Sequence, residues 1–219
     1  MSKIAIIGRH GKKGKSDEKT LWKPGTSLLT EKILDLEMVS QAYIHHIDRA
    51  FCSKGFARTK ETAEILSRLD GQVVEAAELS PLTIHDDASW GPVCTVNGKD
   101  LSPLEIMTEF PEYIRPVGEL GANFVRKTMN EAKESSIYLF ETHQPVAEPI
   151  LAVLLNQWPL KVPVTALNEG DLVKLHFVGE EIHKVQYLSA SRAHDVIQNE
   201  ERRLRINHDY AEMMDGRDH

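Results

Sequence analysis

Apolar residues along this chain follow two alternating periods. Short runs rich in β-branched and aromatic residues, which are typical of buried strands, fall at 4–7, 49–53, 72–79 and 135–142. Between them, apolar residues recur at helical spacing over 30–46, 59–69, 119–134 and 148–158. The segments 171–179 and 181–189 flank a short polar turn and predict an antiparallel hairpin. This alternation predicts an α/β fold: a three-layer α/β/α sandwich with a mostly parallel sheet.

One segment, 80–121, departs from this pattern. It is rich in proline and aspartate and carries only short helical patches, so we expect it to form an insertion or a small cap over the edge of the sheet. The whole chain, 1–219, is long enough to bury a full core, and we expect one domain that includes this insertion.

Composition and charge exclude several classes of protein. With 41% hydrophobic and 27% charged residues, the chain has the composition of an ordinary globular protein. Its longest apolar runs, such as 150–155, are too short to span a bilayer, and the first strand comes before any signal-like apolar region, so we expect a cytoplasmic protein. The net charge of -7 argues against binding to nucleic acid or to an anionic membrane. Cys52 and Cys94 offer neither a disulfide framework nor a zinc site.

Unusual polar residues stand at or near the ends of three predicted strands. Arg9 and His10 follow the first strand, Arg58 opens the helix after the second, and His143 follows a late, strongly apolar strand. Ligands of open α/β sheets bind outside the carboxyl ends of the strands, so these side chains can meet in one crevice. Guanidinium groups pair with phosphoryl oxygens, and a helix start favours an anion. The pattern therefore indicates a phosphate site.

Three stretches carry a family resemblance: "RHG" at 9–11, "CSKGFARTKETAEIL" at 52–66 and "THQP" at 142–145. Over about 3–187 the chain resembles the histidine phosphatase superfamily, also called phosphoglycerate mutase-like. The resemblance implies that His10 is the nucleophile and forms a phosphohistidine, which water then hydrolyses. It also implies that Arg9, Arg58 and His143 bind the phosphoryl group. We expect a phosphomonoester hydrolase without cofactor or metal, acting on a small phosphorylated metabolite or a phosphoprotein.

The proton donor of that family has no obvious counterpart in this chain. Members usually carry a glutamate after the third strand, where this sequence has Pro81, and another branch carries an aspartate after the second histidine, where it has Gln144. The candidates for the general acid are Asp86, Asp87 and Glu78, of which we favour Asp86. A substrate with a good leaving group would need no acid. Ser16 stands where the mutases of the family carry a substrate-binding asparagine, and is a candidate contact.

Three alternatives remain open from the sequence. Cys52 and Arg58 have the spacing of cysteine-dependent phosphatases, in which a thiolate is the nucleophile. The missing acid also fits a catalytically weak module that binds a phosphorylated ligand without turnover. A phosphoglycerate mutase is disfavoured, because the Glu-Arg-His-Tyr-Gly stretch typical of the glycolytic mutases is absent.

Overall fold

The computed structural model describes residues 2–10, 33–69, 71–80, 95–96, 99–143, 145–159 and 167–200 of the chain. The strands are β1 (Lys3–Arg9), β2 (Arg49–Ser53), β3 (Val74–Ala76), β4 (Thr95–Val96), β5 (Lys99–Asp100), β6 (Ile137–Thr142), β7 (Leu172–Val178) and β8 (Glu181–Leu188). The α-helices with defined bounds are α1 (Ile33–Tyr43), α2 (Ala57–Ser67), α4 (Pro103–Glu109), α5 (Pro111–Glu131) and α6 (Ala147–Leu154), and 3-10 turns cover Ala77–Leu79 and Ala190–Arg192.

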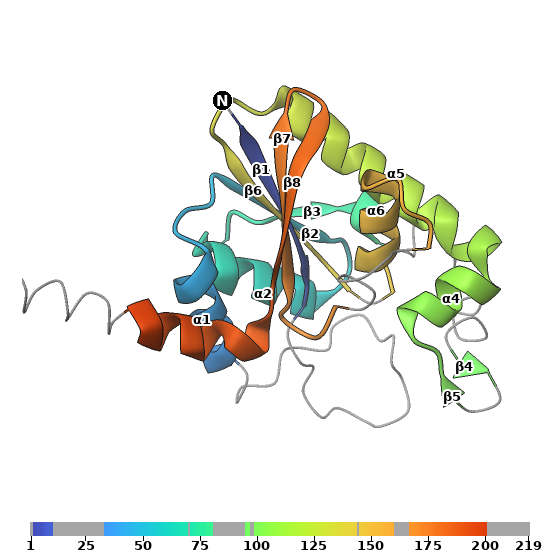
Figure 1. Ribbon diagram of the computed structural model, residues 1–219, viewed down its shortest axis with the longest axis horizontal. Coiled ribbons are helices and arrows are strands. Elements are labelled where there is room, and N and C mark those ends of the chain that lie inside the picture. The colour runs from blue at the N-terminus through green and yellow to red at the C-terminus, as the bar shows by residue number, and fades with distance from the viewer. Residues whose placement is uncertain are drawn as a thin grey trace, which may run out of the picture.

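A six-stranded sheet forms the centre of the molecule, with the order β3-β2-β6-β1-β7-β8 (Figure 1). The first four strands of this order run parallel to one another. β7 pairs antiparallel with β1, and β8 pairs antiparallel with β7, so the predicted closing hairpin is confirmed. The α/β class is also confirmed, and the expectation of a mostly parallel sheet holds for four of the six strands, but the sheet as a whole is mixed. The reason is that the hairpin joins the edge of β1 and adds two strands of alternating direction.

Helices pack on both faces of this sheet, over two separate apolar clusters. One cluster joins α1 and α2 to the face of the sheet that carries Ile6, Ala50 and Leu139. The other joins α5 and α6 to the face that carries Ile7 and Phe140. Because successive strand residues point to opposite faces, neighbours such as Ile6 and Ile7 enter different clusters. Burial of both faces explains why the central strands read as continuous apolar runs rather than as alternating ones.

The helix expected at 119–134 begins earlier than the pattern predicts, because α5 starts at Pro111. The range 80–121 therefore ends inside α5, and its described part contains the β4–β5 pair, α4 and the first half of α5. Proline at the first position of a helix is favourable and explains this start. In Figure 1, α4 and the β4–β5 pair lie at the end of α5 that is away from the sheet. Whether this region caps the site stays a prediction.

α6 is held close to α5 by two glycines. A Cβ atom at Gly118 would stand 2.7 Å from the carbonyl oxygen of Pro149, and one at Gly121 would stand 2.5 Å from the side chain of Ile150. Only glycine therefore allows the two helices to approach this closely. This contact fixes the position of α6, which begins at Ala147, shortly after β6 ends at Thr142. None of the helices in the described part of the chain combines the length and the apolar character needed to cross a bilayer.

Candidate active site

His10 lies just beyond the end of β1 and is held there by the main chain. Its backbone N–H donates to the carbonyl of Thr142 over 2.9 Å, which continues the pairing of β1 with β6 by one residue. The side chain of His10 is 6% exposed. Since His143 follows Thr142, this pairing brings the two predicted histidine positions to the same end of two adjacent strands.

Arg58 contacts His10 directly. Its Nε donates a hydrogen bond of 3.1 Å to Nε2 of His10, and the Arg58 residue is only 4% exposed. A ring nitrogen that accepts a hydrogen bond carries a lone pair, which is the form that a nucleophile requires. Burial lowers the pKa of Arg58, the nearby Glu169 carboxylate opposes this shift, and Arg9 adds to it. Arginine nevertheless keeps its charge at any physiological pH, so Arg58 is a buried cation at the end of the sheet.

His143 is joined to Arg58 through the ring of Phe56. The Phe56 and His143 rings lie 4.3 Å apart between centroids, and Cζ of Arg58 lies 5.7 Å from the centroid of Phe56. His143 is fully buried, and its carbonyl accepts hydrogen bonds from Val146 and Ala147 at the start of α6. Sequence reasoning missed Phe56. The available signal was an aromatic residue two positions before Arg58, at the start of a helix that opens on an arginine.

Arg9, the last residue of β1, is tied to the segment before β7. Its backbone N–H donates to Asp171 and its carbonyl accepts from Gly170, while its Nη1 donates to the carbonyl of Leu167. Nε of Arg9 is buried and has no hydrogen-bond partner among the described residues. Buried donors without partners are rare and costly in folded proteins, and a catalytic role or a bound water or ion is among the explanations for them. The four predicted residues Arg9, His10, Arg58 and His143 are thus brought to one region of the structure.

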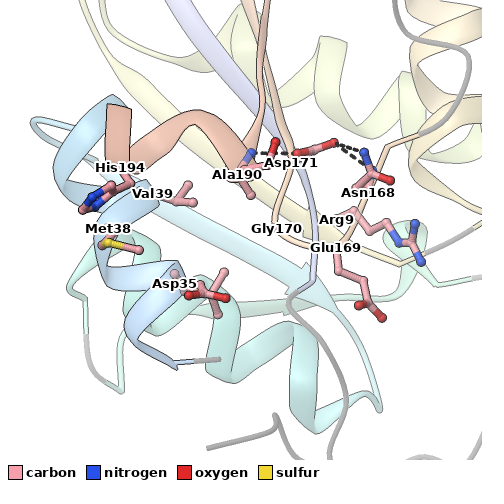
Figure 2. A pocket seen from close by; sticks show the side chains of 12 residues that line it. Arg9, Asp35, Met38, Val39, Asn168, Glu169, Gly170, Asp171, Ala190 and His194 are labelled. Atoms are coloured by element: carbon pink, nitrogen blue, oxygen red, sulfur yellow. Dashed lines mark hydrogen bonds between the residues drawn. The ribbon is translucent and has the colours of Figure 1, made fainter. Parts of the chain in front are cut away.

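A cavity of about 560 Å³ opens beside Arg9, between α1, the segment before β7 and the 3-10 turn after β8 (Figure 2). Arg9 and Glu169 lie side by side at one end of it, whereas Met38 and His194 lie at the other end (Figure 2). Glu169 was not predicted from the sequence, since nothing in "LNEGD" marks it as close to Arg58. The cavity therefore adjoins the arginine of the predicted phosphate site, and its wall includes a carboxylate.

Several predicted residues lie outside the described part of the chain, namely Ser16, Asp86, Asp87, Pro81 and Gln144. Glu78, the remaining candidate acid, is half-buried in the 3-10 turn after β3. Within the described ranges no group of three or more His, Cys, Asp and Glu side chains is arranged to hold a metal ion.

Cys52, the alternative nucleophile, lies inside β2 rather than beyond its end. Its side chain is fully buried in the cluster under α1 and α2. Burial raises the pKa of Cys52 to about 12, and the carboxylates of Glu75 and Glu141 add to the shift. The thiol is therefore protonated at neutral pH and inaccessible, which argues against a thiolate mechanism.

Comparison with solved structures shows the fold to which this chain is similar. Phosphoglycerate mutase from Bacillus anthracis superposes with a TM-score of 0.60 at 16% identity, over 89% of this chain and 96% of that one. Phosphoserine phosphatase from Entamoeba histolytica, in complex with 3-phosphoglyceric acid, gives 0.57 at 14% identity, over 86% and 98%. The protein histidine phosphatase SixA, complexed with tungstate, gives 0.56 at 13% identity, over 86% and 98%.

These structures belong to the histidine phosphatase superfamily, so the resemblance drawn from the three motifs is confirmed at the level of the fold. No family model and no curated protein sequence matches the chain.

Proposed function

We propose that this protein is a phosphomonoester hydrolase in which His10 is the nucleophile. The observation that carries the proposal is the 3.1 Å contact from Nε of Arg58 to Nε2 of His10 at the end of the sheet. It pairs a buried cation with a nitrogen lone pair at the place where α/β folds bind their ligands. Phosphatases among the solved structures of the same fold support the general class of activity.

In the first step, the phosphoryl group binds to Arg9, Arg58 and His143. Arg58 moves its hydrogen bond from Nε2 of His10 to a phosphoryl oxygen, which frees the lone pair of Nε2. Nε2 then attacks phosphorus, the bond from phosphorus to the ester oxygen breaks, and a phosphohistidine forms. The two guanidinium groups stabilise charge on the oxygens of the transferring group, which is where phosphoryl transfer needs stabilisation. In the second step, water attacks phosphorus, the bond to Nε2 breaks and inorganic phosphate leaves.

The leaving oxygen must gain a proton unless it is already a stable anion. We propose Asp86 for this role, with Asp87 and Glu78 as the other candidates, and Ser16 as a contact to the substrate. We propose that the chain forms a single domain over 1–219 with a layered α/β/α arrangement. The segment 80–121 would cap the site and carry the acid and part of the substrate pocket.

The proposed substrate is a small phosphorylated metabolite or a phosphoprotein. Phosphoserine phosphatase and a putative α-ribazole-5'-phosphate phosphatase are examples of the first kind, and a protein histidine phosphatase is an example of the second, among proteins of similar fold. The net charge of -7 supports a partner that is neither nucleic acid nor an anionic membrane. We propose a cytoplasmic enzyme that needs no metal or other cofactor, since an imidazole supplies the nucleophile and arginines supply the charge.

Hydrolysis of p-nitrophenyl phosphate tests this function, because its leaving group needs little protonation. Wild-type protein is expected to release p-nitrophenol in the presence of EDTA and to yield an acid-labile, alkali-stable phosphoenzyme when quenched. The His10→Ala variant is expected to give neither. Activity that is lost to EDTA and restored by a divalent ion would contradict the metal-independent mechanism.

A second candidate is a phospho-ligand binding module with little turnover. The observation in its favour is that neither Pro81 nor Gln144 can supply the acid that the family uses at those positions. An alkyl phosphate, whose leaving group requires a proton, separates the two candidates. Binding of phosphate without hydrolysis of either ester would favour the module, whereas hydrolysis of the p-nitrophenyl ester alone would indicate a working nucleophile without an efficient acid.

A further inference from the structure

Glu148 is a fully buried acidic residue in the first turn of α6, within a segment that is otherwise strongly apolar. Buried carboxylates are costly unless they are hydrogen-bonded or paired with a cation. One oxygen, Oε1, accepts a hydrogen bond of 3.1 Å from the backbone N–H of Leu167. The other, Oε2, is buried and accepts no hydrogen bond from the described residues.

The cation that faces this carboxyl is Arg9. Burial raises the pKa of Glu148, and the positive charge of Arg9 is the largest effect that opposes the shift. The two residues also share a partner, because the N–H of Leu167 donates to Oε1 of Glu148 while the carbonyl of Leu167 accepts from Nη1 of Arg9. Leu167 is 1% exposed, so this exchange of hydrogen bonds takes place away from solvent.

The segment that carries Leu167 is held at its other end by a different acid. The carboxyl of Asp171 accepts hydrogen bonds from the backbone N–H of Asn168, from the hydroxyl of Tyr187 and from the backbone N–H of Ala190. Residues 168–171 are thus fastened to the hairpin, whereas Leu167 is fastened to α6 through Glu148. The Leu167 carbonyl shares a peptide plane with the Asn168 N–H, which Asp171 holds. Loss of the Glu148 bond would therefore remove one of the two attachments that orient this carbonyl.

We infer that Glu148 is a positioning residue of the phosphate site, which orients the Arg9 guanidinium through Leu167 and through its own charge. With Nη1 directed at the Leu167 carbonyl, the edge formed by Nε and Nη2 is left for a phosphoryl group, and this edge has the fork geometry that matches two phosphoryl oxygens. The inference rests on the proposed function for its kinetic consequences, but the orientation of Arg9 can be measured independently.

The test uses Glu148→Gln, which keeps an oxygen for the Leu167 N–H and removes the charge, and Glu148→Leu, which removes both. Glu141→Gln is the matched control, because Glu141 is also a fully buried glutamate with a raised pKa, but its carboxyl shares no hydrogen bond with Arg9 or Leu167. The Nε–H signal of Arg9, assigned with Arg9→Lys, is followed by NMR in the full chain. The dissociation constant of inorganic phosphate and the KM and kcat for p-nitrophenyl phosphate are measured beside it.

We expect both Glu148 variants to shift the Arg9 signal and to weaken phosphate binding, by about tenfold for Glu148→Leu and less for Glu148→Gln. Glu141→Gln is expected to change stability while leaving the Arg9 signal and KM unaltered. An unchanged Arg9 signal in folded Glu148→Gln and Glu148→Leu, or an equal change in Glu141→Gln, overturns the inference. If the wild-type protein neither binds phosphate nor hydrolyses the ester, the proposed function fails, and the NMR comparison still decides the role of Glu148.

Discussion

β1 and β2 each carry a potential nucleophile at or near the C-terminal end of the strand, and only the one after β1 is shown in contact with Arg58. His10 lies one residue beyond β1, its main chain is held by Thr142, and its Nε2 accepts from Arg58. Cys52 lies one residue before the end of β2, with its side chain fully buried in the apolar cluster under α1 and α2. From the sequence alone, both residues are plausible nucleophiles, because each has an arginine at a suitable spacing. Only His10 lies beyond the last residue of its strand, at the end of the sheet.

The difference between the two ends comes from the period of a strand. Ala50 and Cys52 point to the face under α1 and α2, whereas Phe51 between them points to the face under α5 and α6. A residue within a strand is committed to one face and becomes part of the core, whereas a residue beyond the last paired position can turn toward the crevice. A shift by one or two positions along a strand end thus decides between a packing role and a chemical one.

Separate substitution of the two candidate nucleophiles should give the largest difference in kcat. His10→Ala is expected to reduce kcat for p-nitrophenyl phosphate by at least ~10³-fold, since the covalent step is lost. Cys52→Ser and Cys52→Ala are expected to keep kcat within about threefold, because the thiol contacts no reacting atom. Each variant is assayed below its thermal transition. The opposite ranking would move the nucleophile to Cys52.

Removal of the shared arginine should give the next largest effect. Arg58→Ala is expected to lower kcat/KM by about 10²-fold, because a cation that stabilises the transferring phosphoryl group is lost. Arg58→Lys should recover only part of this loss, since a lysine cannot form the same fork of donors. Arg68→Gly, at the left-handed C-terminal residue of the same helix, is the control and should leave kcat/KM unchanged. Glycine is favoured at this left-handed position, so an equal loss of kcat/KM in Arg68→Gly would indicate that removal of any positive charge from α2, rather than loss of a phosphoryl contact, lowers activity.

Side-chain packing around Glu141, which lies on the strand between β1 and β2, can be tested by a substitution at Gly8. Gly8 and Cys52 are both paired with Glu141, and a Cβ atom at Gly8 would stand 2.0 Å from Oε2 of that residue. Gly8→Ala is expected to lower the free energy of unfolding by about 1–3 kcal/mol, as overpacking of a core does.

In the double variant with Glu141→Ala, the loss should be smaller than the sum of the two single losses, as measured by urea unfolding. Strict additivity would show that Glu141 does not impose the glycine.

The smallest expected effect is on the pH dependence of the free energy of unfolding, and it comes from the proton on Glu141. Both carboxyl oxygens are buried without a hydrogen-bond partner among the described residues, and burial raises the pKa of Glu141 well above its ordinary value. Between the unfolded and the folded pKa, the folded state holds a proton that the unfolded state has released. Stability must therefore fall as pH rises through this interval, with a slope of at most ~1.4 kcal/mol per pH unit.

Glu141→Gln has no such proton. Its free energy of unfolding, measured at steps from pH 5 to pH 8, should fall less steeply with pH than that of the wild-type protein. Parallel curves for the two proteins would show that Glu141 is ionised in the fold.

Much of the local structure could be predicted from the chain. The strand at 49–53 and the hairpin of β7 and β8 follow from β-branched runs and a short turn, and the order of strands and helices predicts the α/β class. The direction of β7 relative to β1 could not be predicted, because pairing between distant strands leaves no local pattern. The start of α5 was placed eight residues too late, since the proline-rich composition before Glu119 was interpreted as an insertion.

The residues of the candidate site also fall into two groups, those that could be predicted from the sequence and those that could not. Arg9, His10, Arg58 and His143 were predictable because they combine unusual chemistry with a position near a strand end. Phe56, Glu148 and Glu169 were not, because their importance lies in what they contact: an aromatic ring between a histidine and an arginine, a buried carboxyl behind an arginine, and a carboxylate beside the cavity. A single acid in an apolar helix was the one available signal for Glu148.

The sequence by itself determined the elements, their order and the types of side chain that stand at the strand ends, because these depend on short-range periodicity and on chemistry carried by single residues. Only the tertiary structure decided that Cys52 is core and His10 is not, and that Arg9 is held by Leu167 and faced by Glu148. Those outcomes depend on the register of one strand against another and on burial, which are set by the packing of segments far apart in the chain.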